Sequence, residues 1–265
     1  MPSLVVALAQ LNIRFEDKVV NRIACESVIV RAVRQGAEVV VFPEMTLTGF
    51  SMRARFTGEN AKFSETVEFF STLAKQYRVH VIFGVVFFEK GKGRNMAVVV
   101  DQRGIVIAQY QKVHCFSFVN EDRHFREGTA PTFFTIKNVL CSLAICYDLR
   151  FPGLFEAIAT RAPSVIFVIA NWPSLRIAQW DALLKARALD CAAAVVGVNR
   201  VGGGDGQSYP GHSSVYGPNG ERLINIGHAT LRTCRIDCDA VKVHRMRFPS
   251  LRDKRRSLYA QLLLQ

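Results

Sequence analysis

Short apolar runs alternate with amphipathic stretches along most of the 265-residue chain. The apolar runs are rich in Val, Ile and Phe and are bounded by Gly, Pro, Asn or Asp, which is typical of buried β-strands. They predict strands at Leu4–Ala9, Glu38–Phe42, His80–Phe88, Met96–Val100, Ile105–Tyr110, Val139–Ile145, Val165–Ala170 and Ala194–Val198.

Apolar residues return at helical spacing between the first two of these strands. The repeat of Val19, Ile23, Val30 and Val33 predicts a helix over Lys18–Gln35, with Gly36 as its C-cap. Further helices are predicted at Glu65–Tyr77, Leu154–Thr160 and Leu175–Ala193. Because helices alternate with strands, the pattern indicates α/β architecture.

Two turns rich in glycine and charged residues lie at 90–93 and 101–104. They separate the predicted strands 80–88, 96–100 and 105–110 in the manner of antiparallel hairpins, so we expect a mixed sheet. No Pro- or Ser-rich linker, internal repeat or low-complexity block interrupts the chain. We therefore predict a single domain over residues 1–265, with a basic segment at about 242–265.

The composition is that of a globular protein, with 49% apolar and 21% charged residues, so a sizeable core is expected. No apolar run reaches the length of a membrane span. The segment Met1–Leu4 has neither the basic start nor the small-residue cleavage site of a secretion signal. We expect a cytoplasmic protein with no membrane partner.

The seven cysteines are scattered and odd in number, which favours reduced thiols over a disulfide framework. Cys234 and Cys238 are four residues apart, but no second close pair completes a zinc site. Cys115 with His114 and His124 is an equally poor ligand set. We predict no metal.

The chain is strongly basic, because Lys and Arg total 34 and Asp and Glu total 22, a net charge of +12. Such an excess raises nucleic acid as a partner. Much of it lies between Lys242 and Arg256, where aromatic and basic residues do not alternate, and the sequence contains no known nucleic-acid module. A solvated basic tail is the favoured interpretation, nucleic-acid binding the remote alternative, and attraction of acidic small molecules a third.

Three chemically reactive side chains follow three of the predicted strands. Glu44 comes just after the strand at 38–42, Lys112 just after 105–110, and Cys146 directly after 139–145. Strand ends in α/β sheets are where side chains from distant positions converge on one crevice. A carboxylate, an ammonium group and a thiol placed together are the components of acyl transfer.

Each of these groups would have a separate task. A thiol is mostly protonated at neutral pH, so Glu44 could accept the proton of Cys146 and later give it to departing ammonia. Lys112 and the backbone N–H of Tyr147 could stabilise the oxyanion of a tetrahedral intermediate. Taken singly, a Cys at a strand end is more often a buried apolar residue, and the Glu and the Lys are more often turn or edge residues.

The segment 202–206, Gly-Gly-Gly-Asp-Gly, follows a predicted strand and superficially suggests a phosphate loop. It lacks the G-x-G-x-x-G spacing, and no helical pattern follows it. We interpret it as a flexible surface loop. The sequence also lacks the G-x-S-x-G elbow of serine hydrolases.

Several ordered motifs resemble those of the nitrilase superfamily of carbon–nitrogen hydrolases, and most closely its ω-amidase branch. They are V-V-F-P-E-M-T-L-T-G-F at 40–50, Y-Q-K-V-H at 110–114, C-Y-D-L-R-F-P at 146–152, A-N-W-P at 170–173, K-A-R-A-L-D at 185–190, V-N-R-V-G at 198–202 and H-S-S-V-Y-G-P-N-G-E at 212–221. The resemblance extends from Leu4 to about Pro249.

This resemblance implies a four-layer α-β-β-α sandwich with two mixed sheets face to face. It implies that Glu44, Lys112 and Cys146 form the catalytic triad. The second glutamate of the family, which orients the lysine or the hydrolytic water, would be Glu121. Asp122 and Glu127 are close competitors for that place in the same acidic loop.

Two further residues are candidates for substrate binding. Arg150 lies four residues after Cys146, and its planar guanidinium could pair with a substrate carboxylate. A structural ion pair with Asp148 is an equal alternative. Trp172 could form a wall of the pocket, although core packing is the commoner role of such a residue.

Two positions depart from the family pattern. Gly153 stands where many members have glutamate, which weakens the subclasses that depend on that side chain. Asp190 stands where the family has glutamate in a helical R-A-x-E-N motif, which could alter packing near the site or at a dimer surface.

The favoured function is that of an ω-amidase-like enzyme, which hydrolyses the terminal amide of a short 2-oxo acid through a Cys146 thioester. An N-carbamoyl compound, a nitrile or an aliphatic amide is the alternative substrate. No cofactor is needed, because the thioester is the covalent relay. A homodimer is expected from the resemblance, and the loops 51–60, 114–130 and 172–180 are expected to shape the pocket.

Overall fold

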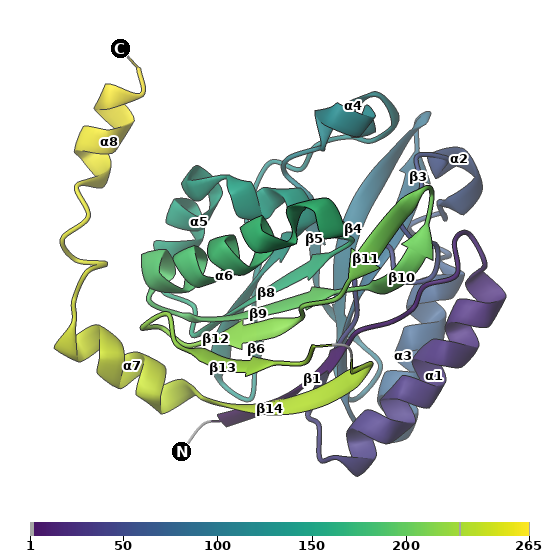
Figure 1. Cartoon of the computed structure of the whole chain (residues 1–265), viewed down its shortest axis with the longest axis horizontal. Helices are drawn as coiled ribbons and strands as arrows, with labels where there is room; N and C mark the ends of the chain where they lie inside the picture. The colour runs from purple at the N-terminus through teal and green to yellow at the C-terminus, as the bar shows by residue number, and fades with distance from the viewer. Residues whose placement is uncertain (1–2, 228, 265) are drawn as a thin grey trace.

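The structure, a computed structural model, describes residues 3–227 and 229–264 and is built around two six-stranded sheets (Figure 1). The strands of the first sheet are β1 (Ser3–Ala9), β2 (Val39–Val41), β3 (His80–Glu89), β4 (Lys92–Val100), β5 (Val106–Gln111) and β14 (Leu231–Asp237). Their order in the sheet is β14-β1-β2-β3-β4-β5. The pairs β1–β2 and β2–β3 are parallel and the others are antiparallel.

The second sheet is mixed in the same way. Its strands are β6 (Phe133–Ile136), β7 (Val139–Ile145), β8 (Val165–Ala170), β9 (Ala194–Asn199), β12 (Ser214–Tyr216) and β13 (Arg222–Asn225), in the order β13-β12-β9-β8-β7-β6. Strands β7, β8 and β9 run parallel. A separate two-stranded sheet pairs β10 (Val201–Gly204) with β11 (Gln207–Pro210).

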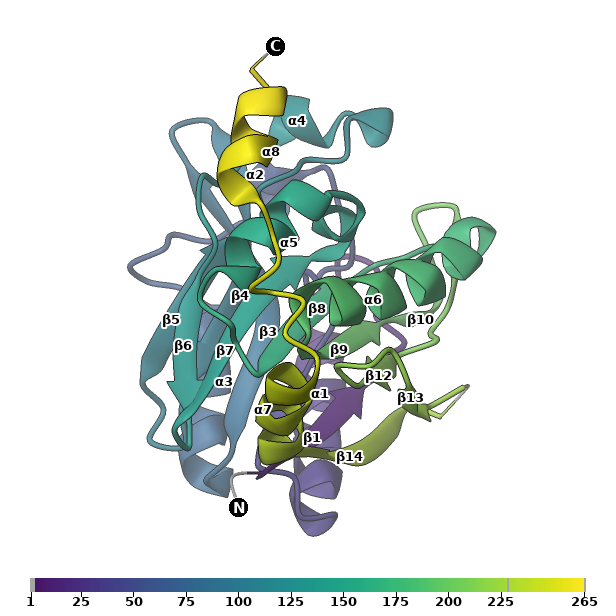
Figure 2. The same cartoon turned by 90° about the vertical axis from the view of Figure 1, so that its left-hand side faces the viewer.

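The helices lie outside the two sheets. They are α1 (Lys18–Arg34), α2 (Ala54–Thr57), α3 (Glu65–Tyr77), α4 (Glu121–His124), α5 (Pro152–Ala159), α6 (Ile177–Cys191), α7 (Cys238–Arg247) and α8 (Arg256–Leu262), with 3₁₀ turns η1 (Ser117–Val119), η2 (Cys146–Arg150) and η3 (Ser174–Arg176). Helices α1 and α3 lie on one side of the molecule, and α5 and α6 lie on the other (Figures 1 and 2). In the part of the chain that the structure describes, no helix is both long enough and apolar enough to cross a membrane.

Successive side chains of each strand point alternately into the core between the sheets and toward the outer helices. In β1, Leu4 and Val6 face the core between the sheets, together with Leu143 of β7, whereas Ala7 faces the core under α1 and α3. In β8, Phe167 likewise faces inward, and its neighbours pack outward on α5 and α6. Because successive side chains of a strand point to opposite faces, each sheet separates two apolar layers. The predicted α-β-β-α sandwich with mixed sheets is confirmed.

The predicted helix over Lys18–Gln35 is confirmed, but the face assigned to it is wrong in its first half. Val19 and Ile23 are 69% and 67% exposed. The helix buries Asn21, Cys25, Val28, Ile29 and Ala32 instead. These residues also recur at helical spacing. Because several of them are small or polar, their hydrophobic periodicity is weaker than that of the exposed valines.

The basic C-terminal segment is only partly the solvated tail that the charge pattern suggested. Arg245 donates to the carbonyl oxygens of Ala162 at 2.7 Å and Ala192 at 2.8 Å, just beyond α5 and α6. Lys254 and Arg256 both pair with Glu156 on α5. A guanidinium satisfies the unpaired carbonyls at a helix C-terminus. These basic residues therefore fasten the segment to the α5–α6 layer.

Gly84 in β3 lets the chain after β2 lie directly on the sheet. A Cβ at this position would be 2.2 Å from the backbone nitrogen of Met45 and 2.9 Å from the Cα of Glu44. The Gly84 N–H also donates to the hydroxyl of Thr46 at 2.9 Å. Any side chain here would push the segment that carries Glu44 away from its place.

We expect Gly84→Ala to lower the free energy of unfolding by about 1–3 kcal/mol, the usual cost of overpacking a close contact. Urea denaturation followed by circular dichroism measures it. The matched control is Gly153→Ala in the first turn of α5, where a Cβ meets no atom within 4 Å. That variant should be unchanged or stabilised by up to about 1 kcal/mol. Equal stability of the two variants would contradict the prediction.

Candidate active site

Glu44 is fully buried, and its carboxylate is held from three directions. Its Oε1 accepts from Lys112 Nζ at 3.0 Å and from Asn95 Nδ2 at 2.8 Å. Its Oε2 accepts from the backbone N–H of Asn171 at 2.9 Å. The acid is therefore oriented by both sheets, since Asn95 lies in β4 and Asn171 follows β8.

Lys112 follows β5 and is only 1% exposed. Its Nζ donates to both oxygens of Glu121, at 3.0 and 2.8 Å, as well as to Glu44. Burial alone would lower the pKa of Lys112, but the carboxylates of Glu121 and Glu44 outweigh it and hold the pKa well above its ordinary value. The amine is therefore a permanent ammonium group.

Glu121, rather than either neighbouring acid, contacts the lysine. It begins the short helix α4, is fully buried, and also accepts the backbone N–H of Phe116 at 2.6 Å. Asp122 and Glu127 are both exposed. Of these three acids, only Glu121 reaches Lys112 in the part of the chain that the structure describes. It is the residue that the family resemblance suggested.

Cys146 is the first residue of η2, at the point where β7 ends. Its φ is +47°, a left-handed conformation that is strained for a residue with a side chain. Its Sγ lies 3.8 Å from the carbonyl oxygen of Asn171. Tyr147 comes next, in the first turn of η2, where backbone N–H groups have no partner within the helix.

Asn171 joins the acid and the thiol, although it was not among the predicted site residues. Its side-chain amide donates to the backbone carbonyl of Glu44 at 2.7 Å, its N–H donates to the Glu44 carboxylate, and its carbonyl faces Cys146. The A-N-W-P motif contains it, but an amide side chain in a loop carries no charge signal that marks it out. Asn95, which donates to both Glu44 and Glu121, was missed for the same reason.

The sulfur of Cys146 is held as a neutral thiol. Burial raises its pKa, the negative charge of Glu44 raises it further, and the opposing effect of Lys112 does not restore it, so the pKa is well above its ordinary value. This shift favours the neutral thiol over the thiolate in the free protein. A nucleophilic role for such a thiol would depend on a base that removes its proton as the sulfur attacks.

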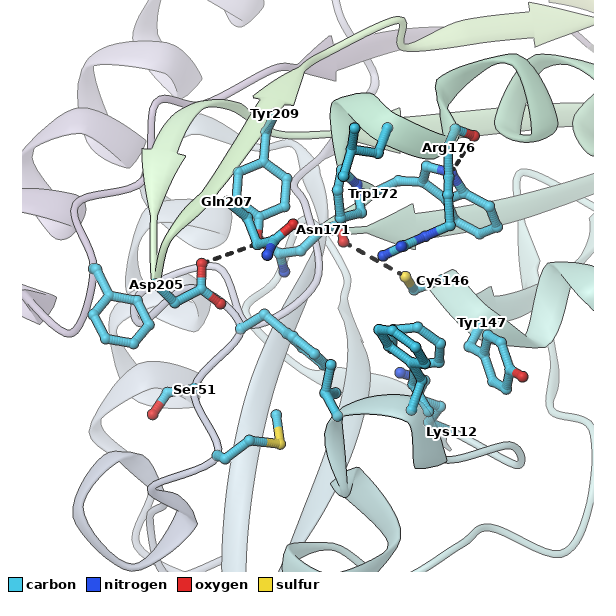
Figure 3. Close-up of a pocket in the computed structure, with 18 of the residues that line it drawn as sticks. Ser51, Lys112, Cys146, Tyr147, Asn171, Trp172, Arg176, Asp205, Gln207 and Tyr209 are labelled. Atoms are coloured by element: carbon cyan, nitrogen blue, oxygen red, sulfur yellow. Dashed lines mark hydrogen bonds between the residues drawn. The ribbon is translucent and has the colours of Figure 1, made fainter.

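A cleft of about 540 Å³ opens above Cys146 and Lys112 (Figure 3). The loops 51–60, 114–130 and 172–180 line it as predicted, through residues such as Ser51, Phe116 and Trp172. The cleft is also lined by residues outside the predicted loops, among them Phe15, Glu16, Asp205, Gln207 and Tyr209.

Asp205 lies in the glycine-rich segment 202–206, Gln207 and Tyr209 follow it, and the interpretation of this segment as a flexible loop is wrong. Strands β10 and β11 form a hairpin, in which Asp205 and Gly206 occupy the turn with φ of +47° and +77°. An Asp-Gly pair with positive φ at both positions is the preferred two-residue hairpin turn. The hairpin forms one wall of the cleft.

Arg150 lines the cleft and does not pair with Asp148. Asp148 is fully buried and accepts hydrogen bonds from Tyr110, His114 and Ile145. The guanidinium of Arg150 instead lies 4.9 Å from the Trp172 ring centre, and one of its nitrogens donates to Gln179. The alternative of an ion pair with Asp148 is therefore excluded.

Trp172 both packs in the core and forms part of the cleft wall, the two roles that were given as alternatives. It is 3% exposed and packs 5.5 Å from Trp180, so it belongs to the core beneath α6. It also lines the cleft, and its indole N–H donates to the backbone carbonyl of Arg176 at 2.8 Å.

The two positions that depart from the family pattern lie outside the cleft lining. Asp190 pairs with Arg187 at 2.6 Å, and Arg187 donates to the carbonyl of Leu149 in η2. The shorter acid therefore still supports the turn that carries Cys146. Within residues 3–227 and 229–264, no group of three or more His, Cys, Asp or Glu side chains could hold a metal ion.

The carbon–nitrogen hydrolase family matches residues 5–248 of the chain. A Staphylococcus lugdunensis protein described as a hydrolase in the agr operon is 34% identical over 216 residues, 80% of this chain and 92% of that protein. The 2-oxoglutaramate amidase of Bacillus subtilis is 29% identical over 84% of this chain and 87% of its own length. A CN-hydrolase superfamily protein of Xanthomonas campestris, with an arsenic adduct in its active site, is 29% identical and superposes with a TM-score of 0.89, covering 96% of this chain and 98% of its own.

We expect no thiolate signal from Cys146 in the free protein below about pH 8.5, the ordinary pKa of a thiol. The raised pKa keeps the proton on sulfur throughout that range. The measurement is the ultraviolet thiolate absorbance of the wild type minus that of Cys146→Ala, as a function of pH. Burial also raises the pKa of the other six cysteines, to about 12 for Cys115 and Cys191, and they cancel in the difference. A difference step near neutral pH would refute the assignment.

Proposed function

The chain belongs to the carbon–nitrogen hydrolase family and acts on amide carbon–nitrogen bonds, and on this premise we propose that its substrate is a small 2-oxo dicarboxylic acid monoamide. Molecules of the 2-oxoglutaramate or 2-oxosuccinamate type would be cleaved to the diacid and ammonia. The observation that carries the proposal is the buried ion cluster of Glu44, Lys112 and Glu121, beside a neutral thiol at the floor of a cleft with a cationic wall.

In the first step, Glu44 accepts the proton of Cys146 while the sulfur attacks the amide carbon. The carbonyl electron pair moves onto oxygen, and the resulting oxyanion is stabilised by the Lys112 ammonium group and the N–H of Tyr147. Donors that are already in place when the charge develops typically contribute factors of about 10²–10³ in rate each.

In the second step, the tetrahedral intermediate collapses as Glu44 gives its proton to the amide nitrogen. Ammonia leaves and Cys146 remains as a thioester. Water then loses a proton to Glu44 and attacks the thioester, with Glu121 holding Lys112 in position. The carboxylic acid departs and the proton returns to sulfur, so the cycle closes without a cofactor.

The anionic character of the substrate is inferred from Arg150. Its guanidinium is free of carboxylate partners among the described residues and lines the cleft beside Trp172. The 2-oxoglutaramate amidase of Bacillus subtilis supports the same substrate class. A neutral amide, a nitrile or an N-carbamoyl compound is the alternative, and a homodimer, a single domain and a cytoplasmic location remain predictions.

We expect the wild type to release ammonia from 2-oxoglutaramate in preference to a neutral amide of similar length. During turnover, intact-protein mass spectrometry should detect a covalent adduct with the mass of the acyl group. Cys146→Ala should show neither adduct nor ammonia. Ammonia released by Cys146→Ala at the wild-type rate would exclude the thioester mechanism, and a preference for the neutral amide would exclude the substrate class.

We expect Glu44→Gln to lower kcat by about 10²–10⁴, because general acid–base catalysis contributes factors of that size. The fold should be retained, since Lys112 keeps its contacts with Glu121. Steady-state kinetics and circular dichroism measure the two quantities. The control is Glu127→Gln, an exposed acid of the same acidic loop as Glu121, which should behave as wild type. A kcat within about threefold of wild type for Glu44→Gln would rule out Glu44 as the proton carrier.

A further inference from the structure

Arg176 is a second guanidinium in the wall of the cleft, and its backbone is firmly held. It ends η3, and its carbonyl accepts the indole N–H of Trp172 at 2.8 Å. Its guanidinium carbon lies 5.4 Å from the ring centre of Phe116. Figure 3 shows the side chain extending into the cleft on the side where Cys146 lies.

The charge of Arg176 is not balanced by the protein. The other cleft cations Arg53 and Lys112 are paired, with Glu16 and with the two buried glutamates respectively. Among the described residues, Arg176 forms neither an ion pair nor a side-chain hydrogen bond. Arg150 also lacks a carboxylate, but one of its nitrogens is already engaged with Gln179.

The opposite wall of the cleft carries negative charge. Asp205 lies at the tip of the β10–β11 hairpin, and its carboxylate accepts a hydrogen bond from Tyr209 at 3.2 Å. In Figure 3, Asp205 and Gln207 stand on the far side of the cleft from Cys146 and Arg176. A substrate carboxylate is therefore repelled at one end and attracted at the other.

We propose that Arg176 is a specificity-determining residue, which binds the substrate carboxylate together with Arg150 and so directs the carboxamide to Cys146. The planar fork of a guanidinium matches a carboxylate with two parallel hydrogen bonds. Its stacking on Phe116 keeps the fork in place at little entropic cost. This inference rests on the proposed function. It adds to Arg150 a second residue that binds the substrate carboxylate, one whose guanidinium has no hydrogen bond to a described residue.

The test uses Arg176→Gln and Arg176→Lys in the full-length chain, with two readouts. The first is the ratio of kcat/KM for 2-oxoglutaramate to kcat/KM for a neutral amide of similar length. The second is the concentration of 2-oxoglutarate that protects the Cys146 thiol from alkylation by iodoacetamide. The control is Arg34→Gln, which removes the same charge from an exposed position at the far end of α1.

We expect Arg176→Gln to lower the kcat/KM ratio about 10- to 100-fold, chiefly through KM, since a charge-assisted hydrogen bond contributes a factor of this size. The protecting concentration of 2-oxoglutarate should rise by a similar factor. Arg176→Lys should recover part of both effects, because it restores the charge without the fork. Arg34→Gln should match the wild type.

The inference is overturned if Arg176→Gln leaves both readouts unchanged, if it lowers both amide activities equally, or if 2-oxoglutarate fails to protect the wild type. The two readouts separate it from the proposed function. If 2-oxoglutarate protects the wild type but not Arg176→Gln, and the wild type hydrolyses no anionic amide, Arg176 still binds a carboxylate. The proposed substrate is then wrong. Wild-type turnover of 2-oxoglutaramate that survives Arg176→Gln would refute the anchor alone.

Discussion

A lysine ammonium buried between two carboxylates is the interaction on which the rest of this structure depends. Burying one charge without partners would cost many kcal/mol, so Lys112 can exist in the interior only with Glu44 and Glu121 beside it. The cluster then carries a net charge of −1. Burial raises the pKa of the Cys146 thiol, and the negative charge of the cluster, chiefly that of Glu44, raises it further. Under the proposed function, a thiol in this environment needs a base next to the sulfur.

The candidate active site spans the boundary between the two sheets. Glu44 and Lys112 follow strands of the first sheet, whereas Cys146 and Asn171 follow strands of the second. The distance between acid and sulfur is therefore set by the packing of one sheet on the other, through the apolar layer that they share. The two hydrogen bonds that Asn171 donates to Glu44, from its backbone N–H and its side-chain amide, fasten the two sheet ends together. Gly84 permits the close approach that this arrangement needs.

The sequence predicted the features that depend on local pattern. Apolar runs located eight of the strands, and the positions just after three of them marked Glu44, Lys112 and Cys146 as candidates, which the family resemblance then implied to form a triad. Asn95 and Asn171 could not be predicted, because an amide acts here through the groups that the fold brings to it. The hairpin at 201–210 was misinterpreted as a loop. A run of glycines indicates a backbone with few steric limits, but it does not indicate which cavity that backbone lines. Helix α1 shows the same limit, because its valines were prominent and its buried small residues were not.

The overall charge of +12 and the local charge of the cleft act at different ranges. Exposed charges are screened beyond about 8–10 Å at physiological salt, so the basic surface can raise the rate at which anions arrive but cannot orient them. Orientation requires unpaired charges within the cleft itself. Arg150 and Arg176 on one wall and Asp205 on the other provide this polarity. Pairing these two arginines with carboxylates would lower the net charge only from +12 to 12 − 2 = +10 and change the outer field little. Under the proposed function, however, the cleft would lose its preference for an anionic substrate.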